Sequence, residues 1–598
     1  MLLALYFVLL ALLTIATRKR SQNVRIGLRL GYNLMFIAAA RILTCVLSLE
    51  TVSLSEILNI TGKSLFMAVQ NITFNGDIDW TGDMSIWFQA QVWFIVMIAS
   101  VLTVQFVLLT FFSKIMRQLK MHINSLFYKT QYVFVGKEKD ALTLIQDLCS
   151  KVHRPFIIYV SDEKLDDTSP LYHLCRVGNR KILKLLKKRI EYHIVILPDV
   201  QFKNMDLLYE LNRNNDKAQN VHITVFLDNE LIRFHDFYTD NVDAFLVSKE
   251  QLIVQRFLSD NPPVNILKQT HSFCEEQALP ILKEPFELCV IGFGSIGQEF
   301  LLSTFENTAF IAGNDNKPFR ALVIDKDISV IKEDFVTEVP YFEYKQQIEF
   351  VQTEIGTDEY YQAIRSRYAG LKQILIATGD TQINIRTTQK LCRYFDRIGE
   401  YHNRPQIVVI LHESFEGAEY LLAKYPNVKT IDINEQIINF ETLIDRIIDS
   451  GARASNEQYN KFNNSNICWN KLGTFTQNSN RAVIRDMYNK RVLFELCNTD
   501  MEQTLEFLAQ YEHSRWNAFY YAHGWMTMPV SDLTEEERKT FRTKHPDEKR
   551  HICLVSWDEL DALPQKTPGL LKYYDLENVK EALKRTTKLP LNISGEII

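Results

Sequence analysis

A glycine-rich segment near the middle of the chain has the residue types and spacing of a phosphate-binding loop. In Cys289-Val-Ile-Gly-Phe-Gly-Ser-Ile-Gly-Gln-Glu-Phe300 an apolar run leads into three glycines, and a helical pattern follows. The first glycine permits a tight turn, the second lets the backbone approach a pyrophosphate, and the third lets the helix pack closely on the strand. Amides at the start of the helix would then donate to the phosphate. We predict a nucleotide site at Gly292, Phe293, Gly294, Ser295, Ile296 and Gly297.

The next apolar run, Ala321-Leu-Val-Ile-Asp325, ends in an acidic residue. This is where a carboxylate would hold a ribose hydroxyl, although an insertion around 307–320 makes the spacing from the glycines longer than usual. Asp325 favours an unphosphorylated ribose over NADP, whose extra phosphate it would repel, and the adjacent Lys326 weakens that preference. A fold of this kind that has lost its ligand remains the alternative.

A third run, Ile374-Leu-Ile-Ala-Thr-Gly-Asp380, ends in a small polar turn, and Asn384 follows at a helix start. Because ligands bind at the carboxyl edge of such sheets, we expect Thr378, Gly379 and Asp380 to lie beside the glycine loop. An ordinary turn between strand and helix explains each of these residues equally well when it is taken alone.

These segments belong to two series of short β-rich runs that alternate with amphipathic stretches, a rhythm typical of βαβ units. The first series is predicted at 132–135, 156–160, 193–197, 222–227 and 244–247, and the second at 288–291, 321–324, 348–351, 373–377, 406–411 and 428–433. The sequence therefore predicts tandem Rossmann-like domains with parallel sheets, at 130–260 and 284–455. The first is degenerate, with a structural or dimerising role, because Gly136-Lys-Glu-Lys-Asp140 lacks the second and third glycines.

The amino-terminal region, residues 1–120, reads as transmembrane helices, with two or three spans. Apolar stretches cover 2–16, 30–49 and 86–112, and a bilayer takes about 20 residues to span. The first stretch is short for a span and is either a retained anchor, which we favour because its charges follow the apolar run, or a signal peptide. Basic residues at 18–29 and 114–129 flank a mostly acidic segment, which favours three spans with the bulk of the chain in the cytoplasm. Arg41 lies within a span, where a charge is costly unless it is paired or faces water. Residues 64–77 read either as a re-entrant loop or as a surface loop.

Composition excludes several classes of function. The net charge of −5 shows no excess of basic residues of the kind that nucleic-acid-binding proteins carry. The nine cysteines show no Cys-x-x-Cys pair, so we expect reduced thiols, with neither a disulfide framework nor a metal site. Neither His-Glu-x-x-His nor Gly-x-Ser-x-Gly occurs, and no general base stands out beside the glycine loop. We therefore expect a binding protein rather than an enzyme; an oxidoreductase would turn over NADH.

The three motifs Gly-Phe-Gly-Ser-Ile-Gly, Val-Ile-Asp-Lys-Asp and Ile-Ala-Thr-Gly-Asp resemble the TrkA-N domain of the RCK family, over residues 286–450 and more weakly over 130–260. The resemblance implies that the domain binds NAD(H) or another adenine nucleotide and transmits binding to a membrane pore, potassium-selective in that family. It also implies a homo-oligomer. The chain departs from the family in having no Thr-Val-Gly-Tyr-Gly filter.

The last part of the chain has a second resemblance. Glu-His-Ser-Arg-Trp at 512–516, His-Gly-Trp at 523–525 and Leu-Val-Ser-Trp at 554–557 resemble the RyR domain, the repeat named for ryanodine receptors. We expect a small, mainly helical domain at 485–598, after an Asn-rich linker at 456–484. Its residues either hold the fold together or form a ligand pocket, which would use Glu512, Arg515, Trp516, Trp525 and Trp557.

The sequence thus predicts a nucleotide-regulated ion channel or transporter-like protein of the inner (plasma) membrane. Its partners would be the lipid bilayer, a nucleotide and further copies of itself. The alternative is a membrane-tethered nucleotide sensor without a pore, of the kind that acts in bacterial defence signalling.

Overall fold

The computed structural model describes most of the chain. The described residues are 2–17, 22–47, 53–72, 85–111, 123, 127–160, 171, 175–177, 190–198, 201–213, 220–239, 241–274, 276–313, 317–398, 404–412, 417–433, 437–462, 465–541 and 543–588. Contacts divide the chain into two compact units, one formed by 1–142 with 154–192 and the other by 143–153 with 193–598.

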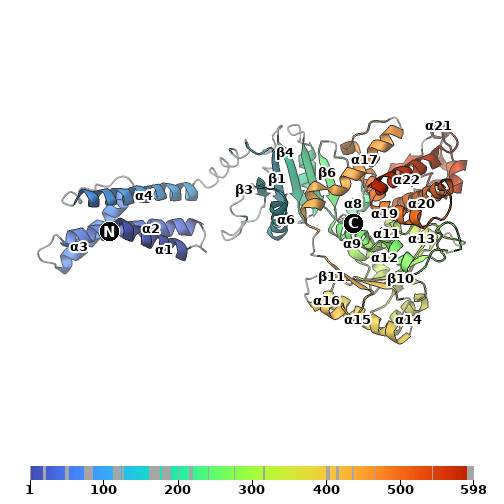
Figure 1. Cartoon of the computed structure of the whole chain (residues 1–598), viewed down its shortest axis with the longest axis horizontal. Coiled ribbons are helices and arrows are strands. Elements are labelled where there is room, and N and C mark those ends of the chain that lie inside the picture. Colours follow the sequence, from blue (N-terminus) through green and yellow to red (C-terminus); the bar gives the residue numbers. More distant parts are fainter. Residues whose placement is uncertain are drawn as a thin grey trace. The chain divides into compact units, whose positions relative to one another are not determined.

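The described residues of 2–111 form four helices, drawn in blue in Figure 1. They are α1 (Leu2–Ala16), α2 (Gln22–Leu47), α3 (Leu54–Ile72) and α4 (Ile86–Phe111). Two of them are long and apolar enough to cross a membrane, over Gly27–Val46 and Ile86–Val107, and α1 has a shorter apolar stretch. Buried residues from all four helices, among them Tyr6, Ile37, Ala68 and Val92, pack into one cluster.

Two polar groups on α2 find partners inside this helical region. Arg41 donates from its guanidinium to the carbonyl of Lys63 on α3, at 3.0 Å, which gives the charged side chain the polar contact that an apolar helix requires. Asn33 accepts from the Tyr6 hydroxyl at 2.6 Å. The segment 64–77 continues α3 as far as Ile72, and its remaining residues lie outside the described ones.

The first sheet has six strands in the order β3-β2-β1-β4-β5-β6. They are β1 (Thr130–Val135), β2 (Ile157–Val160), β3 (Cys175–Val177), β4 (Glu191–Ile196), β5 (Val221–Phe226) and β6 (Asp243–Val247). Its helices are α6 (Glu138–Lys151), α7 (Gln201–Arg213), α8 (Asn229–Phe234), α9 (Lys249–Asp260) and α10 (Pro263–Gln269). The five predicted strands are confirmed, and β3 is an addition too short to show a pattern in the sequence.

The second sheet also has six strands, in the order β12-β11-β10-β7-β8-β9. They are β7 (Phe286–Ile291), β8 (Phe319–Asp325), β9 (Ile348–Gln352), β10 (Leu371–Ile376), β11 (Gln406–Leu411) and β12 (Val428–Asp432). All neighbouring strands pair in parallel. The order reverses at β7, so the glycine loop leaves the sheet at the switch point where such folds bind ligands. The predicted tandem of Rossmann-like parallel sheets is confirmed.

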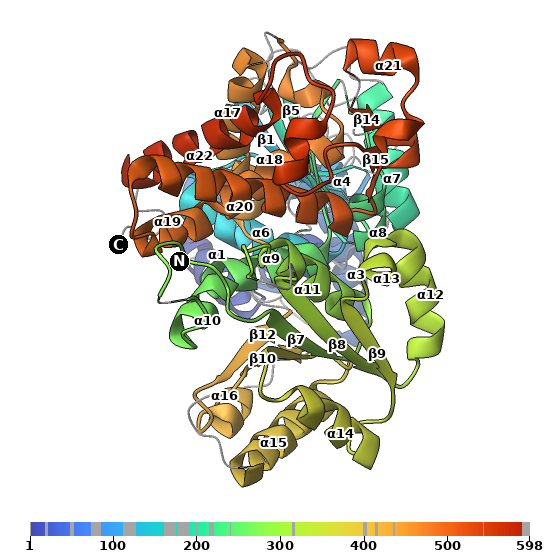
Figure 2. The same ribbon diagram turned by 90° about the vertical axis from the view of Figure 1, so that its right-hand side faces the viewer.

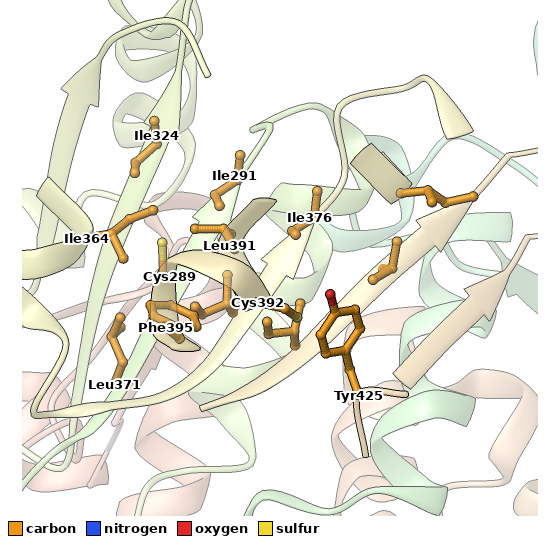
Figure 3. Packing of buried hydrophobic residues seen from close by; sticks show 14 of the residues in the cluster. Cys289, Ile291, Ile324, Ile364, Leu371, Ile376, Leu391, Cys392, Phe395 and Tyr425 are labelled. Carbon is orange, nitrogen blue, oxygen red and sulfur yellow. The ribbon is translucent and has the colours of Figure 1, made fainter. Parts of the chain in front are cut away.

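Helices cover both faces of this second sheet (Figure 2). One face carries α14 (Asp358–Arg367), α15 (Thr381–Ile398) and α16 (Gly417–Leu422), and the other carries α11 (Ser295–Glu306), α12 (Ile328–Glu338) and α13 (Tyr341–Lys345). Alternate residues of the central strands, such as Cys289, Ile291 and Ile376, pack against Leu391 and Phe395 of α15 (Figure 3). Burial of both faces explains why these strands are continuously apolar in the sequence.

The carboxyl-terminal part is mainly helical. It comprises α17 (Ile447–Phe462), α18 (Thr474–Arg485), α19 (Met487–Leu496), α20 (Met501–Ala522), α21 (Glu535–Thr540) and α22 (Leu570–Lys588), with a small sheet of β13 (Met526–Thr527), β15 (Arg550–His551) and β14 (Lys544–His545). It packs on the second sheet domain, where the rings of Tyr341 and Tyr521 stack with centroids 3.9 Å apart.

The segment 456–484 differs from the predicted linker, because it contains the end of α17 and most of α18. Its polar side chains serve packing rather than solvation. Gln477 is buried and donates to the carbonyl of Trp469, and the buried Arg481 donates to Asp449 at 2.6 Å. An Asn-rich composition therefore concealed a helix whose polar groups have partners inside the protein.

A buried carboxylate holds this helical part to the first sheet. Asp243 on β6 lies 2.7 Å from both His222 and Arg453, and 3.4 Å from Arg446. Burial alone would raise the pKa of Asp243, but the hydrogen bond from His222 and the two guanidinium charges lower it well below its ordinary value.

We expect Asp243→Asn to destabilise the protein by about 3 kcal/mol at pH 7, because the buried charge of Arg446 would lose its nearest carboxylate and keep only the weaker interaction with Asp449. A carboxyl whose folded pKa is lowered stabilises the fold above its ordinary pKa of 3.8 and ceases to do so as the pH falls below that value. The difference in thermal unfolding between wild type and variant should therefore shrink below about pH 4. The exposed Asp445→Asn is the control, and an equal effect there would contradict the prediction.

Candidate nucleotide-binding site

The glycine loop has the close contacts that its spacing predicts. Gly292 has a φ of +93°, and a Cβ there would lie 2.4 Å from the carbonyl oxygen of Ala377 at the end of β10. A Cβ on Gly297 would lie 2.2 Å from the carbonyl oxygen of Gly292, so α11 can approach the strand only because this residue has no side chain. By contrast, no atom lies within 4 Å of a Cβ on Gly294. Backbone atoms therefore pack tightly against Gly292 and Gly297, whereas the space beside Gly294 is unfilled.

The opening leads to the start of α11. This helix begins after Gly294 without a side-chain cap, and Gly294 and Ser295 are exposed while Ile296 is half-buried. Uncapped amides at a helix start carry a partial positive charge and attract anions. The Phe293 side chain lies in the core instead, edge-to-face with Phe335 at 5.0 Å, so only its backbone belongs to the loop.

Asp325 ends β8 next to the loop. One carboxylate oxygen accepts from the amide of Phe293 at 2.7 Å, and the other accepts from the amide of Asp327 at 2.8 Å. Each carboxylate oxygen can accept a second hydrogen bond, and the residue is only half-buried. Asp325 therefore fixes the loop and still has acceptor capacity for a ribose hydroxyl. Lys326 is exposed, with its ammonium 3.8 Å from Asp327.

The turn after β10 forms the rest of the carboxyl edge of the second sheet, beside the glycine loop. Thr378 donates from its amide and its hydroxyl to the side-chain oxygen of Asn384, at 2.9 and 2.5 Å, and Asn384 donates to the carbonyl of Ile410 at 2.8 Å. Gly379 has a φ of +82°, and Asp380 accepts from the amide of Ile383. The contact of Ala377 with Gly292 places this turn beside the glycine loop, as predicted from the strand order.

The residue of this region that sequence reasoning missed is Arg233 on α8, which is almost fully buried beneath α11. It donates to both carboxylate oxygens of Glu299 at 2.7 and 2.8 Å, and to Glu306 at 2.7 Å. It also reaches the carbonyl of Ala522, at the end of α20, at 3.5 Å. One guanidinium therefore joins the first sheet domain, the glycine-loop helix and the carboxyl-terminal helices.

The charges of Arg233 and Arg485 both act on the two carboxylates of this cluster. Burial raises the pKa of Glu306 above its ordinary value and outweighs the lowering by these two cations. Burial would lower the pKa of Arg233, but Glu299 and Glu306 raise it, so this arginine stays charged. Burial and the charge of Arg233 lower the pKa of His523, whose ring lies 3.8 Å from Glu306.

The residues predicted for a pocket in the last domain have partners inside the protein. Glu512 pairs with Arg515 at 2.8 Å and with the buried Lys490 at 2.7 Å. Burial raises the pKa of Glu512, but these two cations prevail and lower it to about 2. Trp516 packs on Tyr520 with ring centroids 4.3 Å apart. These contacts form an ionic and aromatic core.

Cations cover the two other tryptophans of this set. The ammonium of Lys572 lies 5.0 Å from the ring of Trp557. Trp525 forms a group with Phe475 and Tyr520, and the ammonium of Lys544 lies 4.9, 5.2 and 5.9 Å from the three rings, in the order Trp525, Phe475, Tyr520. Lys544 thus makes a cation–π contact with each of these three rings.

The fold and this strand edge define a Rossmann-like α/β protein with a glycine-rich loop. No protein-family model matches the chain, and no curated protein matches it. Among solved structures it is similar to one named GsuK Channel, at 16% identity and a TM-score of 0.32, over 68% of this chain and 82% of that one.

Two dehydrogenase structures are also similar to the chain. One is D-lactate dehydrogenase from Escherichia coli, at 13% identity and a TM-score of 0.20, over 57% of this chain and 99% of that one. The other is the NAD-complexed D-isomer specific 2-hydroxyacid dehydrogenase from Lactobacillus delbrueckii ssp. bulgaricus, at 11% and 0.18, over 56% and 98%. Scores this low carry no argument about function.

We expect Arg233→Met to destabilise the protein by about 3 kcal/mol, because Glu299 and Glu306 would lose the cation that they bind directly, and only the more distant charge of Arg485 would remain. The pKa of Glu306 is already raised by burial, and a buried carboxyl with a raised pKa destabilises the fold more as the pH rises, so the variant should unfold at a lower temperature at pH 8 than at pH 5. Arg233→Lys keeps the positive charge but loses the paired hydrogen bonds of the guanidinium, so its unfolding temperature should lie between those of the wild type and Arg233→Met. Differential scanning calorimetry of the full chain measures this, and equal losses at both pH values would contradict it.

Proposed function

We propose that the chain is a membrane-anchored protein whose second sheet domain binds NAD(H) or another adenine nucleotide, and that binding regulates an ion pathway formed by the amino-terminal helices. The observation that carries the nucleotide proposal is the open position at Gly294, between the uncapped start of α11 and Asp325. A pyrophosphate fits the helix start, and the ribose of the same molecule would reach the carboxylate.

The buried cluster supplies a route from the nucleotide to the rest of the chain. Glu299 lies one turn after the start of α11, so any shift of this helix on binding moves the main partner of Arg233. The displaced guanidinium would then change its contact with Ala522. Regulation requires two arrangements of this cluster that differ in affinity for the nucleotide, and a desolvated ion pair favours discrete arrangements over gradual ones.

The ion pathway rests on the membrane part and on the resemblance of residues 286–450 to RCK-type domains. Two helices of sufficient length and hydrophobicity precede the sheet domains, which is the order of elements in channels regulated by such domains. The basic stretches beside these helices favour a plasma-membrane protein with its sheet domains in the cytoplasm. A pore would need several copies of the chain around one axis, so the proposal includes a homo-oligomer.

A membrane-tethered sensor without a pore is the second candidate. It is favoured by the lack of a Thr-Val-Gly-Tyr-Gly sequence anywhere in the chain, and by α3, which runs as one helix over Leu54–Ile72 where a pore loop would stand. In both candidates the nucleotide is a ligand and not a substrate. Steady consumption of NADH by the purified chain would replace both with an oxidoreductase.

We expect the purified full chain to bind NAD(H) more tightly than NADP(H), because Asp325 would repel a phosphate on the ribose. Gly294→Asp should weaken binding by at least about tenfold, since its carboxylate would occupy the phosphate position. The fold should tolerate this change, because Gly294 has a φ of −72° and open space around it. Isothermal titration calorimetry measures the affinities.

Gly313→Asp is the matched control, because it adds the same charge at a glycine with its nearest neighbour 3.7 Å from a Cβ. Unchanged binding in Gly294→Asp would refute the proposed site. Binding lost equally in both variants would indicate a general defect in the fold.

We expect proteoliposomes that contain the full chain to show potassium flux that depends on the nucleotide and is lost in Gly294→Asp. The physical reason is linkage, since a ligand that favours one arrangement of the Arg233 cluster shifts the population that conducts. A fluorescent potassium-flux assay measures it. Absence of flux with every nucleotide, while calorimetry still shows binding, would leave the sensor without a pore.

A further inference from the structure

The start of α9, which follows the last strand of the first sheet, lies beside the glycine-loop helix. Ser248 caps α9 and donates from its hydroxyl to the side-chain oxygen of Asn229 at 2.9 Å. The side-chain amide of Asn229 in turn donates to Glu299 at 2.8 Å, one turn after the start of α11. The first residue of α9 is Lys249, so this packing brings a cation from the first sheet domain to the carboxyl edge of the second sheet.

The charge of Lys249 acts on the part of this edge where β11 ends. Burial lowers the pKa of His412, the residue after β11, and the charge of Lys249 lowers it further, while Asp380 in the turn after β10 opposes both. Lys249 is half-buried, and among the described residues its ammonium forms neither a hydrogen bond nor an ion pair, with Asp380 or with any other acid. The lysine therefore has its full charge available to a ligand at this edge.

The order of the strands determines which part of a nucleotide would reach this lysine. The strands run β11-β10-β7-β8, so Asp325 after β8 and His412 after β11 lie on opposite sides of the glycine loop, which follows β7. Neighbouring strands are about 4.8 Å apart. A nucleotide whose ribose contacts Asp325 and whose pyrophosphate contacts the start of α11 must therefore direct its other end over β10 and β11, toward Lys249.

We propose that Lys249 binds the terminal phosphate of a nucleoside triphosphate held by the glycine loop, and that the site therefore prefers ATP to a dinucleotide. This inference rests on the proposed function and specifies which adenine nucleotide the site selects. In NAD⁺ the group beyond the pyrophosphate carries a positively charged nicotinamide ring, which Lys249 would repel. In ATP that group is a phosphate, which an ammonium without an ion-pair partner attracts. The bound triphosphate would then contact both α9 and α11.

The test is isothermal titration calorimetry of the purified full chain with ATP, ADP and NAD⁺, in the presence of EDTA so that no metal ion neutralises the phosphates. ADP is the matched ligand, because it keeps the ribose and the pyrophosphate and lacks only the terminal phosphate. We expect ATP to bind at least about tenfold more tightly than ADP or NAD⁺. Lys249→Met should lose this preference and still bind ADP within about threefold of the wild type.

Two further variants separate a ligand contact from a general effect of charge or fold. Lys268→Met removes the same charge from an exposed position on α10 and should leave the preference for ATP unchanged. Lys249→Arg keeps the charge and should retain most of the preference. Lys249→Met should also leave the unfolding temperature of the ligand-free chain nearly unchanged, because the lysine has no ion pair to lose.

The outcomes distinguish this inference from the proposed function. ADP or NAD⁺ that binds the wild type as tightly as ATP, or a preference for ATP that survives in Lys249→Met, would overturn the role of Lys249 and leave the glycine-loop site in place. Absence of binding by every nucleotide would overturn both the inference and the proposed site.

Discussion

The structure of the larger unit depends on one buried guanidinium. Arg233 lies where the first sheet domain, the glycine-loop helix and the carboxyl-terminal helices meet, and it gives two carboxylates the positive charge that they need away from water. A buried ion cluster of this kind adds little net stability over an apolar core, but it strongly disfavours any arrangement that separates its members. The three parts are therefore held in fixed relative positions, and a movement of one of them requires the other two to move with it.

The proposed nucleotide site at the carboxyl edge of the second sheet depends on glycines, which have no side chains, and not on buried charges. Gly292 and Gly297 are needed where backbone meets backbone, while Gly294 leaves space that nothing in the chain fills. Asp325 then holds the loop in place through the amide of Phe293, so the site is formed before a ligand arrives. Preformed sites bind without the entropic cost of ordering a loop, which suits the proposed binding of a nucleotide.

Much of this could be predicted from the sequence, because parallel strands buried on both faces give apolar runs and because glycine spacing reports on backbone geometry. The end of α17 and most of α18 were missed, since their polar residues, such as Gln477 and Arg481, read as solvated but have buried partners. Arg233 was missed for the same reason. A single arginine on a six-residue helix shows nothing in sequence, and its partner Glu299 lies 66 residues away.

The contact between Arg233 and Ala522 spans 289 residues, and this has a consequence for how the protein is made. During synthesis Arg233 and then Glu299 leave the ribosome long before α20 does. Their two charges can therefore pair before Ala522, the contact from the carboxyl-terminal helices, is present. During that interval the glycine-loop helix is exposed on the side that α20 later covers. The charged cluster is therefore fully buried only after the last helices have been synthesised. A truncated chain that lacks them would leave these charges exposed to solvent, where chaperones and proteases can recognise the incomplete fold.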